Sequence, residues 1–213
     1  MKKLIISILL LILFNNAYSQ KFYLTPKAGI TLAKQSNTYK ENHRKLGLTF
    51  GVALEYNITK RLSLQSELNY VQKGYLEKGQ YHVVDPNDPV LINSDYKLKI
   101  SYNYLEIPVS IKVNFGNKKF KFYGYTGPSF AYLLNENSNL VIYHFDLSNK
   151  DKLNFGWQVG TGCKLFLFGP GAMVFDIKYD GSISKLYKDS SPYNPRNNYF
   201  AFNVGYAFPL GKK

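Results

Sequence analysis

Residues 104–115 read YLEIPVSIKVNF, and this stretch decides how the rest of the chain is interpreted. Every odd-numbered position from Leu105 to Phe115 is apolar, whereas Glu106 and Lys112 occupy even-numbered positions. Successive side chains of a β-strand point to opposite faces, so the alternation predicts a strand with one apolar and one polar face. Those faces meet either a protein core and water, or a lipid bilayer and a filled lumen.

Similar alternation recurs along the chain, and the connections between the alternating stretches differ in length in a regular way. We expect eight strands, at residues 22–33, 46–57, 62–75, 97–115, 120–134, 152–168, 172–187 and 198–210. Tight connections (NITKR, GNKK and FGPGA) follow the second, fourth and sixth strands, and long polar connections follow the first, third, fifth and seventh. This rhythm predicts an all-β fold, an eight-stranded antiparallel up-and-down barrel with all tight turns at one end.

Residues 1–19 have the features of a cleaved signal peptide. MKK supplies a positive start, residues 4–14 are apolar, and Ala17 and Ser19 have the spacing of a cleavage site. The apolar run is too short to span a membrane. We therefore expect an exported protein in which residues 20–213 form one barrel domain. Its formal charge would be +11, since Lys2 and Lys3 leave the +13 of the full chain.

Small residues distinguish a membrane barrel from a soluble one. A soluble lipocalin-like barrel turns its apolar face inward, whereas a membrane barrel turns that face outward to lipid. Gly or Ala occupies the polar face at positions 51, 53, 156, 160, 162, 205 and 207. The interior of an eight-stranded barrel is only just wide enough for side chains, so small residues are needed there. The pattern favours a transmembrane barrel in the cell outer membrane, with both termini periplasmic.

The polar face carries a balanced set of charges, which predicts a plugged lumen. These residues are the acids Glu55, Glu67, Glu106 and Asp176 and the bases Lys27, Lys112, Lys164 and Lys178. An unpaired charge in a narrow lumen would cost several kcal/mol, so four acids against four bases indicate ion pairing. If Leu167 pairs with Met173, Lys164 lies opposite Asp176 as a cross-strand ion pair.

Most of the excess positive charge falls near the tight turns and at the C-terminus. The expected periplasmic basic rim consists of Lys60, Arg61, Lys118, Lys119, Lys121, Lys212 and Lys213. It would either contact lipid phosphates or be a solvated rim that aids solubility. In the first long connection, Lys34, Lys40, Arg44 and Lys45 outnumber Glu41, which would suit acidic glycolipid outside the cell. The basic residues form no RNA-binding motif, so nucleic acid is not an expected partner.

Two prolines fall within expected strands, where a missing N–H group should interrupt the hydrogen-bond ladder. If the GNKK turn pairs Phe115 with Phe120, Pro108 lies opposite Gly127 and Pro128 opposite Ile107. The two gaps then coincide at one level of a hairpin, and we expect a bulge or kink there.

The stretch YLEIPVSIKVNFG, followed by a tight turn and KFYGYTGPSFAYLL, resembles the PorT-like, porin-like outer-membrane β-barrel family of Bacteroidetes-type bacteria (outer membrane protein beta-barrel domain). In that family a YLEIPL strand precedes a strand of the pattern Y…GP…GYL. GWQVGTGCKL, MVFDIKYDGSISKLY and NYFAFNVGYAF are similar to its later strands. The resemblance spans the mature chain and implies the fold and the outer membrane, but no catalytic residues. Nothing in the sequence singles out the namesake, which belongs to a secretion and gliding apparatus.

No catalytic, cofactor-binding or metal site is expected. His43, His82 and His144 fall in three different long connections without the short spacing of a metal site. No nucleophile motif surrounds His144, Ser138 or Ser148. The lone Cys163 excludes an intramolecular disulfide and is interpreted as a small apolar strand residue.

These features predict a non-enzymatic integral outer-membrane barrel with a plugged lumen. Its outer loops would contact outer-membrane lipid and lipopolysaccharide, or other envelope proteins. The alternative is a narrow porin passing ions or small solutes, and a second alternative is a lipid-modifying hydrolase. Planar-bilayer conductance separates the first two, and the lipid profile of a strain with His144 replaced tests the third.

Overall fold

The computed structural model describes residues 22–38, 41–84, 91–117, 119–139, 150–167, 170–186 and 194–210, and for 81–84 and 91–95 the backbone alone. Within these ranges the secondary structure is eight β-strands. They are β1 (Phe22–Ser36), β2 (Lys45–Asn57), β3 (Leu62–Val84), β4 (Leu91–Gly116), β5 (Phe120–Ser138), β6 (Leu153–Leu165), β7 (Ala172–Ser182) and β8 (Arg196–Leu210). No helix among the described residues is long and apolar enough to cross a membrane.

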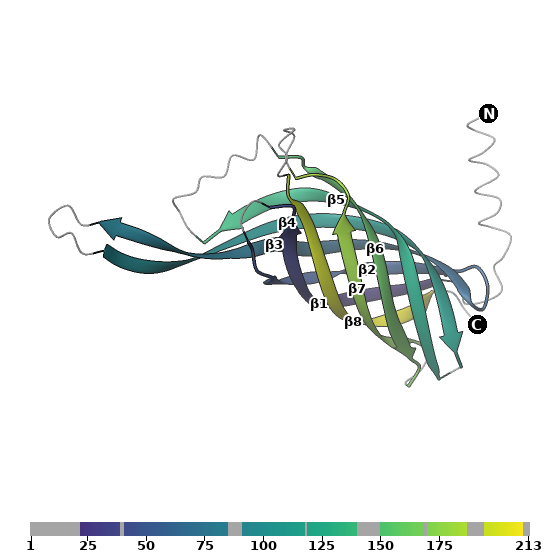
Figure 1. Cartoon of the computed structure of the whole chain (residues 1–213). Helices are drawn as coiled ribbons and strands as arrows, with labels where there is room; N and C mark the ends of the chain where they lie inside the picture. The colour runs from purple at the N-terminus through teal and green to yellow at the C-terminus, as the bar shows by residue number, and fades with distance from the viewer. Residues whose placement is uncertain are drawn as a thin grey trace, which may run out of the picture.

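The strands form a closed barrel in which each pairs antiparallel with its neighbours in the chain, and β8 closes the ring against β1 (Figure 1). The predicted eight-stranded up-and-down barrel is therefore confirmed. Phe22 pairs with both Tyr56 and Leu210, which places the start of β1 and the end of β8 at the end with the tight turns. The predicted signal peptide, residues 1–19, lies outside the described residues.

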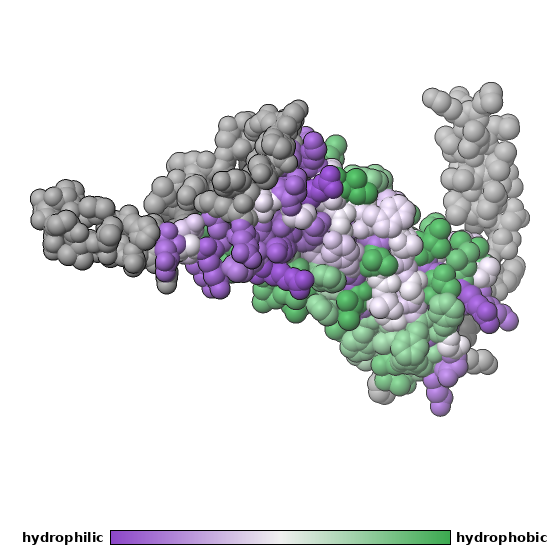
Figure 2. All heavy atoms as spheres, viewed as in Figure 1, coloured by the Kyte–Doolittle hydropathy of each residue, from purple (hydrophilic) through white to green (hydrophobic). Residues whose placement is uncertain are grey.

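The two faces of each strand are oriented as the alternation predicts. On β4, Ile107, Ile111 and Phe115 are 46%, 59% and 58% exposed, whereas Glu106 and Lys112 are buried. The same division holds on β2, where Leu48 and Phe50 point outward. Figure 2 shows the result as apolar residues over the barrel wall, with polar residues gathered towards both ends.

The stretch 76–96, predicted to be a loop, is mostly a continuation of β3 and β4, so that prediction is wrong. The two strands pair from Leu76–Lys99 to Val84–Leu91. Residues 77–84 and 91–98 form a two-stranded ribbon that projects beyond the barrel (Figure 1). At about 3.3 Å per residue, its eight rungs span roughly 25 Å. The sequence does not predict these strands because residues 77–84 and 91–98 lack a strict alternation of apolar and polar residues.

The predicted register of the β4–β5 hairpin is wrong by two residues. Phe115 pairs with Phe122, and Pro108 with Ser129, instead of the expected Phe120 and Gly127. The expected bulge at the prolines is also misplaced, because the register shifts between Asn103 and Tyr104. At Pro128 the regular pairing with β4 is interrupted over two rungs while the register continues unchanged. A shift of two residues preserves which side chains face inward, so Tyr123, Tyr125 and Ser129 of β5 are buried while Phe122 and Phe130 are exposed.

Inward glycines provide space for tyrosine side chains near the tight-turn end. A Cβ atom added to Gly160 would overlap the ring of Tyr125, and one added to Gly162 would lie 2.5 Å from Tyr123 Oη. Both tyrosines are almost completely buried. The small residues of the polar face are thus matched by large residues on the neighbouring strand, as the narrow interior of an eight-stranded barrel requires.

Candidate functional site

The centre of the lumen holds a continuous chain of seven alternating acids and bases. In order of contact they are Asp176, Lys27, Glu67, Lys178, Glu106, Lys73 and Asp180. The shortest contacts join Lys27 Nζ to Glu67 Oε1 at 2.9 Å and Lys178 Nζ to Glu106 Oε1 at 3.0 Å. Because these side chains come from β1, β3, β4 and β7, the chain crosses the lumen and links opposite walls.

A second cluster lies nearer the tight turns and is joined to the first. Glu55 accepts hydrogen bonds from Lys112 Nζ at 2.8 Å and Lys164 Nζ at 2.7 Å. Gln65 connects the clusters, because its carbonyl oxygen accepts from Lys112 and its amide donates to Glu67. The two clusters together contain five acids and five bases, and none of the ten residues is more than 7% exposed.

All eight charged residues expected in the lumen lie in these two clusters, together with two that the expected set lacked. Asp180 lies on the polar face of its strand, as the alternation indicates, but was not counted in the charge balance. Lys73 lies near Tyr75, the expected end of the strand, and was therefore not among the expected mid-strand charges. Lys73 has an odd residue number, like the inward Gln65 and Glu67, and this shared parity indicates that its side chain also points inward.

The expected ion pair between Lys164 and Asp176 does not form. Leu165, not Leu167, pairs with Met173, so Lys164 lies opposite Val174 and Asp176 opposite Gly162. Each residue instead finds a partner from another wall. Lys164 contacts Glu55, and Asp176 lies 3.5 Å from Lys27.

Apolar and aromatic clusters lie on both sides of the charged network. Towards the loop end, a buried cluster consists of Leu98, Ile100, Tyr102, Tyr104, Ala131, Leu133 and Leu186. Leu186 belongs to the segment after β7, and its backbone bonds to Asp151 and Pro195 hold it over this cluster. Towards the tight turns, Tyr123, Tyr125, Ala172, Val174 and Ala207 are buried together, with Tyr23 and Phe166 packed against them. Apolar and aromatic side chains thus flank the network on both sides along the barrel axis.

Charged residues also pack on aromatic rings at the ends of the network. Lys73 Nζ lies 4.8 Å from the centre of the Tyr199 ring and 5.1 Å from that of Tyr104. Lys112 Nζ lies 3.9 Å from the centre of the Tyr123 ring. The aromatic faces therefore supplement the carboxylates as partners for the buried ammonium groups.

The tight-turn end brings part of the expected basic rim together. Lys60, Arg61 and Lys121 line one cavity of about 350 Å³ with residues 114–116, and Lys119 is exposed nearby in the chain. The backbone of Arg61 anchors this turn to β4 by accepting a 2.6 Å hydrogen bond from Asn114 N. Lys118, Lys212 and Lys213 lie outside the described residues.

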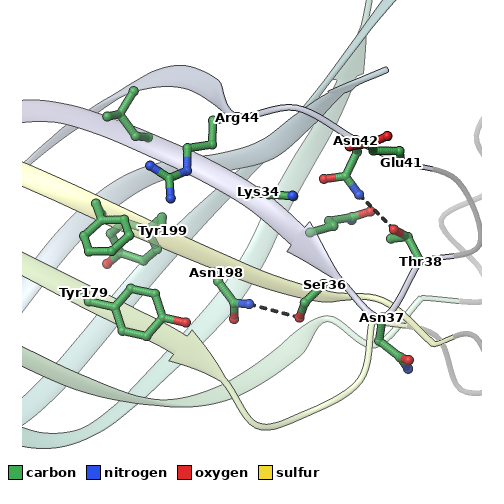
Figure 3. A pocket seen from close by; sticks show the side chains of 13 residues that line it. Lys34, Ser36, Asn37, Thr38, Glu41, Asn42, Arg44, Tyr179, Asn198 and Tyr199 are labelled. Carbon is green, nitrogen blue, oxygen red and sulfur yellow. Dashed lines mark hydrogen bonds between the residues drawn. The ribbon is translucent and has the colours of Figure 1, made fainter. Parts of the chain in front are cut away.

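At the loop end, the connection between β1 and β2 crosses the outside of the barrel. Arg44 lies over the ring of Phe200 in β8, 5.4 Å from its centre, and Phe200 packs against Tyr179 at 5.0 Å. Lys34 and Arg44 line a cavity of about 460 Å³ between this connection and the outer face of β1 and β8 (Figure 3). Lys40 of the same connection lies outside the described residues, and Lys45 points inward.

The described residues assemble no metal site, and they include only part of the residues considered for a hydrolase. No group of three or more His, Cys, Asp or Glu side chains among them is placed to hold a metal ion. His43 forms a backbone bridge to Leu76 at the base of the ribbon. Ser138 ends β5, whereas His144, Ser148 and the side chain of His82 lie outside the described part of the chain.

A family model described as an outer membrane protein beta-barrel domain matches residues 16–188. The chain belongs to this family. It is therefore an integral β-barrel protein of the cell outer membrane, and the apolar outer face of the barrel meets lipid. No curated protein matches the chain.

Solved structures give the same fold. The crystal structure of Neisserial surface protein A (NspA) is similar at 14% identity with a TM-score of 0.55, covering 90% of this chain and 98% of that one. The outer membrane protein OprG from Pseudomonas aeruginosa is similar at 11% identity with a TM-score of 0.55, covering 92% of this chain and 99% of that one. At such identities the likeness concerns the fold alone.

Proposed function

We propose that the protein is a non-conducting, non-enzymatic barrel whose lumen is sealed and whose loop end contacts the outer-membrane surface. The observation that carries this proposal is the buried network of five acids and five bases, flanked on both sides by aromatic and apolar clusters. A passing ion would have to separate buried pairs, each of which costs several kcal/mol to break. The network therefore acts as a structural plug.

The alternative, a narrow porin, requires a water-filled path along the axis. Liposome swelling tests it with small neutral and charged solutes. Proteoliposomes of the full mature chain should swell no faster than empty liposomes, after heat-modifiable migration has shown that the barrel is folded. Faster swelling with any small solute would support the pore and contradict the plug.

The proposed orientation places the tight turns and the basic rim in the periplasm and the β3–β4 ribbon outside the cell. It is supported by the general rule that outer-membrane barrels have short periplasmic turns and longer external loops. In a Cys163→Ser background, Lys97→Cys on the ribbon should react with a membrane-impermeant maleimide in intact cells. Lys60→Cys in the tight turn should react only after the outer membrane is permeabilised. The reverse pattern would refute the orientation.

The proposed partners at the loop end are outer-membrane lipid, lipopolysaccharide and other envelope proteins. The ribbon supports a role in contact because it carries backbone edges beyond the barrel. Cross-linking from Lys97→Cys in intact cells should capture partners that are absent when the same probe is attached at Glu41→Cys, an exposed position in the β1–β2 connection at the same end of the barrel. Equal capture from both positions would argue against a ribbon-specific contact.

The remaining proposals concern chemistry and subfamily. The absence of enzymatic activity is tested by the lipid profile of the outer membrane, which a His144→Ala strain should leave unchanged. A changed lipid profile would support the hydrolase alternative.

The proposed PorT-like affiliation rests on the YLEIPVSIKVNFG and KFYGYTGPSFAYLL segments.

A further inference from the structure

Two hollows lie one above the other on the outer wall of the barrel, the upper over β1, β7 and β8 and the lower extending from β1 to β5. The upper hollow, of about 460 Å³, is the cavity beside Arg44 and Lys34 (Figure 3). The lower hollow, of about 620 Å³, is lined by Ile30, Phe122, Cys163, Phe175, Phe202 and their neighbours. The upper is lined by charged and polar side chains together with Leu32, Tyr179 and Phe200, whereas the lower is almost wholly apolar.

The strand register shows that the hollows are in line. Tyr179, Phe200 and Leu32 occupy one rung across β7, β8 and β1, and they line the upper hollow. Two residues along each strand, Ile177, Phe202 and Ile30 form the next rung on the same face, and they line the lower hollow. This step corresponds to roughly 7 Å along the wall. One elongated molecule can therefore occupy both.

The upper hollow has the chemistry of a phosphate site at the edge of a membrane. Arg44 and Lys34 supply two cations against the single acid Glu41. Asn198 donates to Ser36 at 3.0 Å, and Asn42 donates to Thr38 at 2.9 Å, so polar groups border the same space (Figure 3). Phe200 and Tyr179 form an aromatic floor like those at the interfaces of membrane barrels.

The lower hollow exists because small side chains interrupt the outer surface of the wall. Cys163 lies between Phe122 and Phe175 on one rung, and Thr161 lies between Gly124 and Ile177 on the next rung on that face. A Cβ atom added to Gly124 would meet only the oxygen of Gly160, at 3.9 Å, so the space above it is open. Its apolar lining suits a hydrocarbon chain.

We propose that this wall binds one phosphate-bearing lipid of the outer leaflet, with its phosphate held by Arg44 and Lys34 and an acyl chain in the hollow over Cys163. The alignment of a cationic hollow above an apolar one is the observation that selects a lipid over a soluble anion. The assignment to the outer leaflet rests on the proposed orientation of the barrel. The binding itself does not depend on whether the lumen is sealed.

Native mass spectrometry of the folded full mature chain tests the proposal, with bisphosphorylated lipid A as the probe. The wild type should retain one lipid A. Lys34→Gln/Arg44→Gln should weaken retention by roughly tenfold to thirtyfold, since a basic residue at an anionic lipid surface contributes about 1 kcal/mol. The matched control Lys97→Gln/Lys99→Gln removes the same charge at the exposed base of the ribbon and should retain lipid A normally. Equal loss in both variants would overturn the proposal.

Two further arms separate the headgroup from the chain. Dephosphorylated lipid A should bind the wild type as weakly as lipid A binds Lys34→Gln/Arg44→Gln, and inorganic phosphate at millimolar concentration should not displace lipid A. Equal binding of both lipids would refute phosphate recognition. Displacement by inorganic phosphate would show that the acyl chain adds nothing to retention and would refute a lipid-specific site.

The acyl-chain site is tested by filling it. Cys163→Trp should weaken lipid A retention severalfold, whereas Phe130→Trp, at a lipid-facing position outside both hollows, should have no effect. Both substitutions point to lipid, which accommodates side chains of any size, so both variants should fold. Unchanged retention in Cys163→Trp would refute this part. If labelling with the membrane-impermeant maleimide placed the ribbon in the periplasm, only the assignment of the lipid to the outer leaflet would be refuted.

Discussion

Lys178 Nζ lies 3.0 Å from Glu106 Oε1, although the strands that carry them, β7 and β4, are not neighbours in the barrel wall. The pair therefore spans the lumen, and both side chains are almost completely buried. Glu106 also accepts a 2.6 Å hydrogen bond from Tyr199 Oη and lies 3.1 Å from Lys73 Nζ. The Glu106 carboxylate thus connects β4 to side chains of β3, β7 and β8.

Replacing Glu106 with leucine should strongly destabilise the barrel. The substitution leaves Lys178 and Lys73 buried with weaker remaining contacts, and removing one partner of a buried pair typically costs about 3–5 kcal/mol. The midpoint of urea unfolding in detergent micelles or lipid vesicles measures the loss. Glu41→Gln, at an exposed position in the β1–β2 connection, should change the free energy of unfolding by less than about 0.5 kcal/mol.

Removing Lys178 as well should restore part of this loss. The double variant Glu106→Leu/Lys178→Met no longer buries an unpaired ammonium group at this point. It should therefore be more stable than Glu106→Leu alone by roughly 1–2 kcal/mol. Additive losses in the double-mutant cycle would show that the two side chains do not interact energetically.

Gly160 should not tolerate even one added methyl group. A Cβ atom there would overlap the ring of Tyr125 inside the lumen, and overpacking of this kind costs about 1–3 kcal/mol. Gly124→Ala is the matched control, because the Cβ would enter open space on the lipid-facing side. Equal unfolding midpoints for Gly160→Ala and Gly124→Ala would contradict the crowded lumen.

The ribbon should be dispensable for folding. Beyond the bridge between His43 and Leu76 its two strands pair only with each other among the described residues. Residues 80–95 can therefore be replaced by an Asn-Gly turn that closes the rung between Gly79 and Tyr96. The shortened chain should keep its heat-modifiable migration and lose less than about 1 kcal/mol of stability. Loss of the folded band would show that the ribbon contributes to the barrel itself.

The faces of the strands could be predicted from the sequence because a lipid-facing wall imposes a strict period of two. That constraint identified Glu55, Glu67 and Glu106 as inward residues without any knowledge of pairing. Register could not be predicted in the same way, since the alternation is unchanged when a strand shifts by two residues. The β4–β5 and β6–β7 registers were both wrong by that amount, and the partner of Lys164 was wrong with them.

The parts of the site that were missed lie where the membrane no longer constrains the sequence. Lys73 is near the point at which β3 leaves β2, and the ribbon beyond it has no uniform apolar face. The link between Lys178 and Glu106 depends on the closure of the barrel, which places β4 and β7 across from each other. The spacing of residues along the sequence carries no information about the distance between β4 and β7 across the lumen.

Single-channel recording in planar bilayers tests the central claim, the sealed lumen, most directly. After insertion of the folded wild-type barrel, the membrane should show no stable open steps across the voltage range that the bilayer withstands. This result is expected if the buried ion pairs and the aromatic clusters seal the lumen, as we propose. Reproducible open steps of the wild type, absent in protein-free bilayers, would contradict the plug and support a pore.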